Sequence, residues 1–344
     1  MANERSEIAS LGEFGLINRI QQHVTIQNSS SLKGIGDDAA VIDAGEESVL
    51  LSTDMLMEGI HFDLSYVPLQ HLGYKAVAVN VSDIAAMNGR PEQIVIGLGL
   101  SNRFSVEAID ALYSGIRAAC EDYAVDLVGG DTTSSASGLV ISISIIGKTK
   151  KGNVVYRSGA KNNDIICVTG DLGGAYLGLQ VLEREKQVFL TNPEMEPELE
   201  KYEYVVGRQL KPKARMDIIH ELEELNIIPT SMIDISDGLA SELLHISESS
   251  NVGVKIFEDK IPIDSSAFET AMEFKLDPFV CALNGGEDYE LLFTINLADF
   301  EKLKNHPDIH FIGHIHDNAK QNVMITKQET VVPLSAQGWN HLKS

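Results

Sequence analysis

Helices and strands are expected to alternate along the first half of this chain, judging from its pattern of apolar and polar positions. Helices with one buried face are predicted where apolar residues recur three and four positions apart, over residues 11–22, 74–89 and 106–123. Strands are predicted where short apolar runs occur, several of them rich in β-branched residues, at residues 48–55, 93–100, 125–133 and 139–149. These elements form a mixed α and β unit that ends near residue 149.

The second half repeats a plan of strand, turn and helix. Residues 164–170 and 231–237 are apolar runs that end on glycine or aspartate, and each precedes a segment with helical spacing. A further helix is expected over residues 210–226, and the segment 183–204 is expected to be a solvated excursion because it is rich in Glu and interrupted by prolines. The predicted architecture is an α/β protein of two domains, residues 1–149 and 150–344.

Composition narrows the class of partner. The chain has 344 residues, 44% of them hydrophobic, and a formal net charge of -23. This acidity argues against DNA, RNA or an anionic membrane surface as the main partner, because such partners require basic patches. Three isolated cysteines, no secretory signal pattern and no apolar run of spanning length predict a reduced, cytoplasmic protein.

Several aspartates stand beside glycines or at the ends of predicted strands. Asp37 and Asp38 are adjacent within the glycine turn at residues 34–39, and like charges so close require a cation or backbone donors. Ser52 and Asp54 share one face of a predicted strand, where hydroxyl and carboxylate oxygens suit Mg²⁺. Taken singly, each of these sites is equally consistent with a turn or a helix cap.

The same pattern recurs further along the chain. Asp83 lies among alanines and valines in a predicted helix, where it needs either a metal or an ion pair with Lys75 or Arg90. Asp131 follows two glycines at a strand end, and Asp234 shares a strand face with Ser236. Asp237 stands at the N-terminus of the next predicted helix. A simple turn or cap would also explain these residues one at a time.

The number of such carboxylates favours a shared function. Convergence of about six carboxylates would require several cations, and several Mg²⁺ ions predict a polyphosphate ligand and phosphoryl transfer. Arg157 is placed to bind a phosphate between the two halves. The chain lacks a Walker loop and the protein-kinase motifs, and the turn at residues 170–175 fails the dinucleotide pattern G-x-G-x-x-G. ATP would therefore be bound through metal ions.

The motifs themselves resemble a known family. In order along the chain these are GEFGLI, GIGDDAA, STDML-x-x-G-x-HF, YKAVAVNVSDIAAM, VGGDTT, RSGAK, DISDGL, GGEDYEL and GWNH. Together they resemble the thiamine-monophosphate kinase family of the aminoimidazole ribonucleotide synthetase superfamily, over nearly the whole chain. The resemblance implies a two-domain fold of the synthetase type, usually a homodimer paired through N-terminal strands. It also implies transfer of the ATP γ-phosphoryl group onto thiamine monophosphate, giving thiamine diphosphate in the last step of its biosynthesis.

Residue roles follow from the resemblance, position by position. The Mg²⁺ ligands it implies are Asp38, Ser52, Thr53, Asp54, Asp83, Asp131, Asp234 and Asp237. The ATP contacts it implies are Tyr113, Gly130, Asp131, Arg157 and Ser236. Thiamine monophosphate is expected to contact His61, Glu287 and Trp339. No residue is expected to act as acid or base, because the acceptor phosphate is already mostly ionised at neutral pH.

Two alternatives remain open from the sequence. The chain could be another ATP-dependent synthetase of the superfamily, although no Cys precedes Cys120 and none follows Cys281, where related enzymes carry reactive cysteines. It could also be an acidic cation-binding protein without catalysis, which predicts calcium loops that the sequence does not contain.

Overall fold

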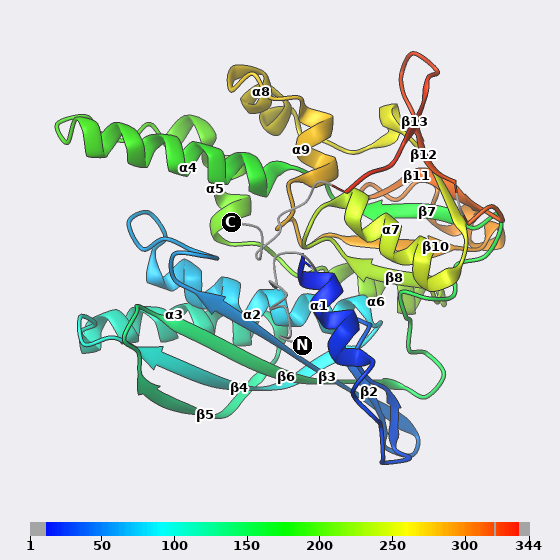
Figure 1. Cartoon of the computed structure of the whole chain (residues 1–344), viewed down its shortest axis with the longest axis horizontal. Coiled ribbons are helices and arrows are strands. Elements are labelled where there is room, and N and C mark those ends of the chain that lie inside the picture. The colour runs from blue at the N-terminus through cyan, green and yellow to red at the C-terminus, as the bar shows by residue number, and fades with distance from the viewer. Residues whose placement is uncertain (1–11, 320, 337–344) are drawn as a thin grey trace, which may run out of the picture.

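The computed structural model describes residues 12–319 and 321–336, in which two β-sheets pack against helices (Figure 1). The N-terminal sheet has the order β1-β2-β3-β6-β4-β5 and contains Ser31–Lys33 (β1), Ala40–Asp43 (β2), Glu47–Met57 (β3), Arg90–Leu100 (β4), Asp126–Ser134 (β5) and Val140–Lys150 (β6). The C-terminal sheet has the order β13-β12-β9-β11-β7-β10-β8 and contains Ile165–Thr169 (β7), Ser231–Asp234 (β8), Gly253–Phe257 (β9), Leu291–Ile295 (β10), Ile309–His316 (β11), Asn322–Ile325 (β12) and Val331–Pro333 (β13).

Helices surround and separate the two sheets. The N-terminal half contains Gly12–Gln21 (α1), Leu69–Ala86 (α2) and Val106–Tyr123 (α3). The C-terminal half contains Gly174–Thr191 (α4), Glu203–Leu210 (α5), Met216–Glu224 (α6), Leu239–Ser250 (α7), Ser265–Glu273 (α8), Pro278–Asn284 (α9) and Phe300–Leu303 (α10), with 3₁₀ turns at Glu200–Tyr202 (η2), Glu258–Lys260 (η3) and Leu297–Asp299 (η4). Among the described residues, none of these helices has the length and apolar character needed to cross a bilayer.

Helix α2 lies at the centre of the molecule. It packs on β3, β4 and β6 of the N-terminal sheet and, on its other sides, against α3, α5, α6 and β8 (Figure 1). This position explains why nearly all of its residues from Leu72 onward are buried, including polar ones. The contact with α3 is close because it is made at glycines: a Cβ on Gly115 would lie 1.8 Å from the carbonyl oxygen of Gln70. Helix α2 can therefore carry side chains to both halves.

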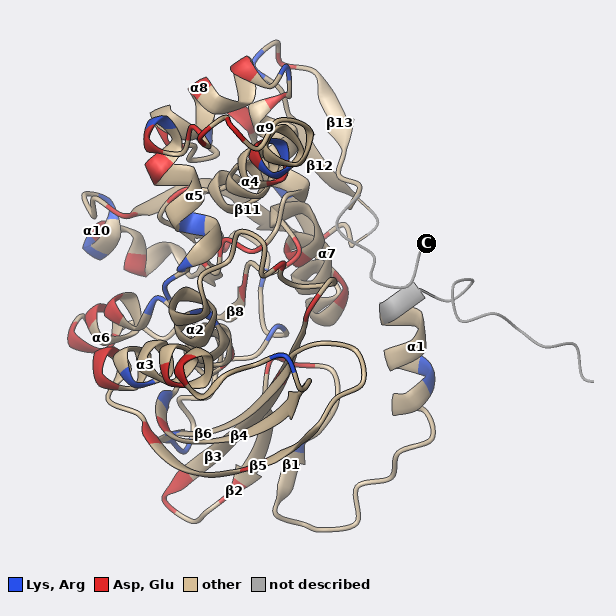
Figure 2. Cartoon of the chain, turned by 90° about the vertical axis from the view of Figure 1, so that its left-hand side faces the viewer, with Lys and Arg blue, Asp and Glu red and all other residues tan. Residues whose placement is uncertain are grey.

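The two faces of the N-terminal sheet differ in what covers them. Side chains that alternate along the strands, such as Leu50 and Leu56 of β3, point toward α2 and are buried. The opposite side, here called the outer face, carries exposed apolar residues: Leu51, Met55, Met57, Val95 and Ile146. In Figure 2 the strands of this sheet are mostly tan, whereas acidic residues stand out on α3 and α6. The outer face is therefore apolar and nearly uncharged in a strongly acidic protein.

Most predicted elements are present, with different ends. The helix predicted at 106–123 coincides with α3, whereas α2 begins at Leu69, directly after Pro68, earlier than predicted. The prediction that residues 183–204 form a solvated excursion is correct only for residues 192–198, which are exposed and not helical. Helix α4 continues to Thr191 because its buried side, which includes Leu182 and the 7%-exposed Glu185, packs in the core. The helix predicted at 210–226 begins only at Met216.

Candidate active site

Three carboxylates from both halves of the chain meet beside α2. Asp38 follows β1, Asp83 lies in the last turns of α2, and Asp234 ends β8. One carboxylate oxygen of each lies within 4.8 Å of the others. Asp38 and Asp234 are buried, at 8% and 3% exposure. The strand ends and the central helix thus bring together residues that are almost two hundred positions apart in sequence.

Each carboxylate of this cluster is held by a neighbouring polar group. The guanidinium of Arg157 donates to both oxygens of Asp38, with Nη2 at 2.6 Å and Nε at 3.3 Å. The Ser82 hydroxyl donates to Asp234 at 2.6 Å, and the Ser52 hydroxyl contacts the Asp83 carboxylate. Arg157, which the sequence predicts to bind a phosphate, therefore binds the Asp38 carboxylate through two nitrogens.

The alternative ion pairs of Asp83 do not form. Lys75 pairs instead with Glu287, and Arg90 pairs with Glu223. Asp83 is left with a hydroxyl and with other carboxylates as its neighbours. Removal from water raises the pKa of Asp83 well above its ordinary value, and the charges of Asp54, Asp234 and Asp38 raise it further.

The pKa values of Asp234 and of Asp54, a fourth carboxylate beside the cluster, are raised in the same way. Burial raises the pKa of Asp54 to about 6. Burial, together with the charge of Asp38, raises the pKa of Asp234 to about 7. One arginine cannot balance four carboxylates at neutral pH, and the cluster offers only oxygen atoms. This donor set fits a hard divalent cation such as Mg²⁺.

Two predicted ligands lie apart from the cluster. The β3 alternation that turns Ser52 and Asp54 toward α2 turns Thr53 to the outer face, where its hydroxyl donates to the carbonyl oxygen of Ile143 at 2.9 Å. Asp131 pairs in register with Gly97 of β4, which places it on the outer face as well, and it is exposed. Gly130 is next to it on β5.

Further predicted residues lie on helices and turns. Tyr113 is half-buried on α3 and packs against the core. Ser236 and Asp237 follow β8 directly, with Ser236 exposed and Asp237 half-buried. The backbone N–H of Asp237 donates to Glu242 at 2.9 Å.

The sequence prediction missed Glu242. It lies in the first turn of α7, is 1% exposed, and its second carboxylate oxygen has no hydrogen-bond partner among the described residues. Burial raises its pKa well above the ordinary value, and the charge of Asp237 adds to the shift. The available signal was an acidic residue between apolar ones on a helix that follows the DISDG turn.

In the turn at residues 285–290, four consecutive polar side chains, those of residues 287–290, each contact a different part of the protein. Glu287 and Tyr289 have left-handed backbones, with φ of 60° and 52°. The carboxylate of Glu287 pairs with Lys75 of α2, and Tyr289 is buried close to Asp54, Asp83 and Asp234, whose charges help to raise its pKa after burial itself. Non-glycine residues hold this backbone only where their surroundings fix it.

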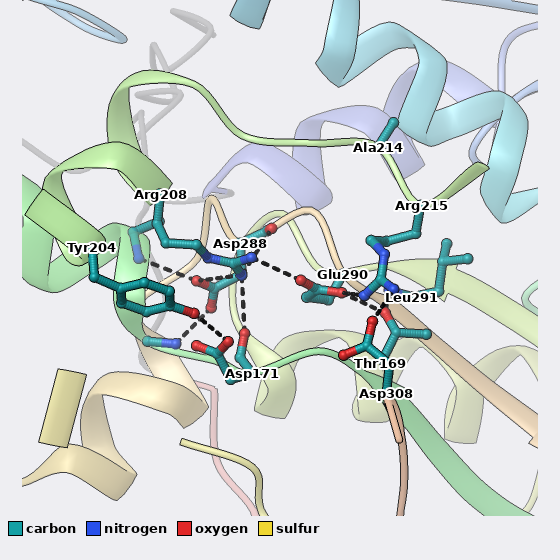
Figure 3. Close-up of polar contacts among 12 residues, drawn as sticks. Thr169, Asp171, Tyr204, Arg208, Ala214, Arg215, Asp288, Glu290, Leu291 and Asp308 are labelled. Atoms are coloured by element: carbon teal, nitrogen blue, oxygen red, sulfur yellow. Dashed lines mark hydrogen bonds and ion pairs between the residues drawn. The ribbon is translucent and has the colours of Figure 1, made fainter. Parts of the chain in front are cut away.

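Asp288 and Glu290 supply that fixation (Figure 3). Asp288 accepts hydrogen bonds from the backbone N–H groups of Gly173 and Ala175, at 2.7 and 3.2 Å, at the beginning of α4. Glu290 accepts from Arg208 at 2.8 Å and from Arg215 at 2.6 Å. The turn at residues 170–175, which looks like a phosphate-binding turn, thus binds a carboxylate of its own chain.

His61 lies near Glu287. It follows β3, and its Nδ1 accepts the backbone N–H of Met57 at 3.0 Å. Burial would raise the pKa of Glu287, but Lys75 opposes it most strongly and nearby His61 adds a smaller effect, so the pKa is lowered on balance. His61 and Glu287, both expected to contact the acceptor, are therefore neighbours. Trp339 lies outside the described residues.

Comparison with known proteins identifies the family. The chain is 37% identical to the thiamine-monophosphate kinase of Bacillus subtilis, over 97% of this chain and 100% of that protein. It is 33% identical to the thiamine-monophosphate kinase of Aquifex aeolicus, over 97% and 99% of the two chains. The chain belongs to the thiamine-monophosphate kinase family.

The fold agrees with this membership. A solved structure described as AaThiL complexed with AMPPCP and TMP superposes with a TM-score of 0.82 at 31% identity, over 98% of this chain and 100% of that one. Residues 36–149 match the family described as AIR synthase related protein, N-terminal domain. The predictions of a thiamine-monophosphate kinase family member and of an α/β fold of the synthetase type are confirmed.

Proposed function

We propose that this protein is a thiamine-phosphate kinase, which transfers the γ-phosphoryl group of ATP directly to thiamine monophosphate and so forms thiamine diphosphate. The observation that carries the proposal is the carboxylate cluster of Asp38, Asp83 and Asp234 in a member of this family. A cluster of this charge suits a polyphosphate that arrives with divalent cations. The related structure described with AMPPCP and TMP supports the same pair of substrates.

The metal-binding residues proposed here are Asp38, Ser52, Asp54, Asp83, Asp234 and Asp237, with Thr53 and Asp131 from the outer face. When bound, Mg²⁺ would neutralise the phosphate oxygens and the charge that develops on them during transfer. Of these residues, the carboxylates around Asp83 are held in place before binding by Ser52, Ser82 and Arg157, so little reorganisation is required.

The roles proposed for the other residues concern alignment. Tyr113, Gly130, Asp131, Arg157 and Ser236 would contact ATP, and His61, Glu287 and Trp339 would contact thiamine monophosphate. Arg157 reaches the cluster from the segment that joins the two sheets, where it could exchange a carboxylate for a phosphate oxygen. No side chain needs to remove a proton from the acceptor, so alignment and charge neutralisation are sufficient.

A direct assay tests the proposal. Purified protein incubated with ATP, Mg²⁺ and thiamine monophosphate should form thiamine diphosphate and ADP in equal amounts. Chelation of the metal with EDTA should stop the reaction, and excess Mg²⁺ should restore it. Consumption of ATP only with an aminoimidazole ribonucleotide precursor, and none with thiamine monophosphate, would show that the protein belongs to another branch of the superfamily.

We also propose a homodimer that pairs through the N-terminal sheets. The outer face supports it, since Met55 is 53% exposed and Val95 is 43% exposed on a surface with few charges. Residue Val128 on the edge strand β5 adds to this surface at 61% exposure. Pairing would bury these residues and place Thr53 and Asp131 close to the partner subunit.

Two further expectations remain proposals. The division into domains at residues 149 and 150 is supported by the separation of the two sheets, because β6 ends at Lys150 and β7 begins at Ile165. A cytoplasmic location is supported by the three cysteines, which are all free thiols, two of them buried.

A further inference from the structure

Lys75 is a buried cation whose function the carboxylate cluster does not explain. It lies near the middle of α2 and is 4% exposed, although the rest of that stretch is mainly apolar. Burying an ammonium group is costly unless it is paired and hydrogen-bonded. The groups that pair with the Lys75 ammonium therefore indicate the function of this residue.

Among the described residues, the partners of the ammonium group all belong to the C-terminal half. Lys75 Nζ pairs with Glu287 Oε2 and donates to the carbonyl oxygen of Gln209 at 3.3 Å. The side-chain amide of Gln209, on α5, donates to the same Oε2 atom at 3.2 Å. Two donors from two helices thus hold one oxygen of Glu287.

The other oxygen of Glu287 is differently placed. Among the described residues its contact is with the Tyr289 hydroxyl at 3.5 Å, the limit of a hydrogen bond. The Glu287 side chain keeps 30% exposure, whereas the side chain of Lys75 keeps 4%. The backbone is fixed as well, because the N–H of Glu287 donates to the carbonyl oxygen of Ser236 at 2.7 Å. One oxygen is anchored by two donors, and the other has the long contact with the Tyr289 hydroxyl.

We propose that Lys75 is a positioning residue that holds Glu287 as an ionised carboxylate and directs its Oε1 atom toward the acceptor substrate. An ionised carboxylate accepts hydrogen bonds only. It therefore selects an acceptor that presents N–H donors or positive charge, and thiamine monophosphate carries both an amino group and a cationic ring. This inference rests on the proposed function, because it assigns a role within the acceptor site.

A double-mutant cycle tests the role of Lys75. Lys75→Met should raise the KM for thiamine monophosphate by about ten- to a hundredfold, the worth of a charge-assisted hydrogen bond. The KM for ATP should change less than about twofold, because the carboxylate cluster is untouched. Lys75→Arg should recover part of the loss. In a Glu287→Gln background, Lys75→Met should add less than about a twofold effect, since the group it positions has already lost its charge.

Controls separate this role from a structural one. Lys211→Met removes an exposed lysine that lies over the ring of Tyr74, at 4.1 Å from the ring centre, and should leave both KM values unchanged. Circular dichroism should show that all variants are folded. Multiplicative losses from Lys75→Met and Glu287→Gln, or an equal rise in the KM for ATP, would overturn the positioning role. A wild-type protein that does not phosphorylate thiamine monophosphate would instead overturn the proposed function itself.

Discussion

Replacing Asp234 by Asn should make the metal-free protein more stable while abolishing turnover. Burial and the neighbouring Asp38 raise the pKa of Asp234 to about 7, from an ordinary value of 3.8. The folded protein therefore holds this proton more tightly than the unfolded chain does, and its free energy of unfolding falls as the pH rises from about 4 to 7. A pKa difference of about three, at about 1.4 kcal/mol for each pH unit, lowers the free energy of unfolding of the wild type by ~4 kcal/mol at pH 8. Asn lacks this cost and can still accept the hydrogen bond from Ser82.

Urea denaturation followed by circular dichroism measures this effect. In EDTA at pH 8, Asp234→Asn should unfold at higher urea than the wild type. At pH 5.5 the difference in free energy of unfolding between the two proteins should be about 2 kcal/mol smaller than at pH 8. At this pH the folded wild type still holds the proton on Asp234, whose pKa is about 7, and has not yet lost the stability that ionisation removes. Added Mg²⁺ should stabilise the wild type more than the variant.

A surface variant provides the reference for this comparison. Asp110→Asn removes an exposed carboxylate on α3 and should change the stability little at either pH. If Asp234→Asn were no more stable than the wild type at pH 8 in EDTA, the carboxylates would not repel one another, and the reasoning from their burial would be refuted.

Three other outcomes follow from the structure. Asp54→Asn should abolish formation of thiamine diphosphate while the circular dichroism spectrum stays unchanged; normal turnover would remove Asp54 from the site. Glu290→Gln should lower the free energy of unfolding by about 1–3 kcal/mol, because Arg208 and Arg215 lose their shared buried carboxylate but each keeps another carboxylate partner; a thermal midpoint equal to that of the wild type would contradict this. Met55→Glu should halve the mass measured by light scattering, because it places a charge on the proposed dimer surface; an unchanged mass would exclude the outer face as the interface.

The sequence predicts the local elements well and the long-range arrangement less well. Helix α3 was predicted to its end residues because its amphipathic pattern is complete, with an N-cap at Ser105. Helix α4 was cut short in the prediction because prolines and glutamates suggested a loop, whereas one of these glutamates, Glu185, lies on the buried side of the helix. Local composition does not reveal whether one side of such a segment has a core to pack against.

In the candidate site too, local features are predicted from the sequence and long-range contacts are not. The strand alternation correctly separates Ser52 and Asp54 from Thr53, because it depends only on neighbouring positions. The pairing of Lys75 with Glu287 joins residues from different halves, and nothing in either segment alone indicates it. Likewise, the sequence offers Arg90 as a partner for Asp83 as readily as any other basic residue. Only the packing of α2 between the halves determines which charges meet.

The contact between Asp288 and the start of α4 also has a consequence for the proposed acceptor site. A carboxylate on the same chain is present at a high effective concentration, so free phosphate cannot compete with it for the amides of Gly173 and Ala175. The turn at residues 285–290 is thus already ordered when the substrates arrive. The conformational entropy of Glu287 and Tyr289 is therefore lost when the chain folds. It is not lost again when substrate binds, so it does not weaken binding.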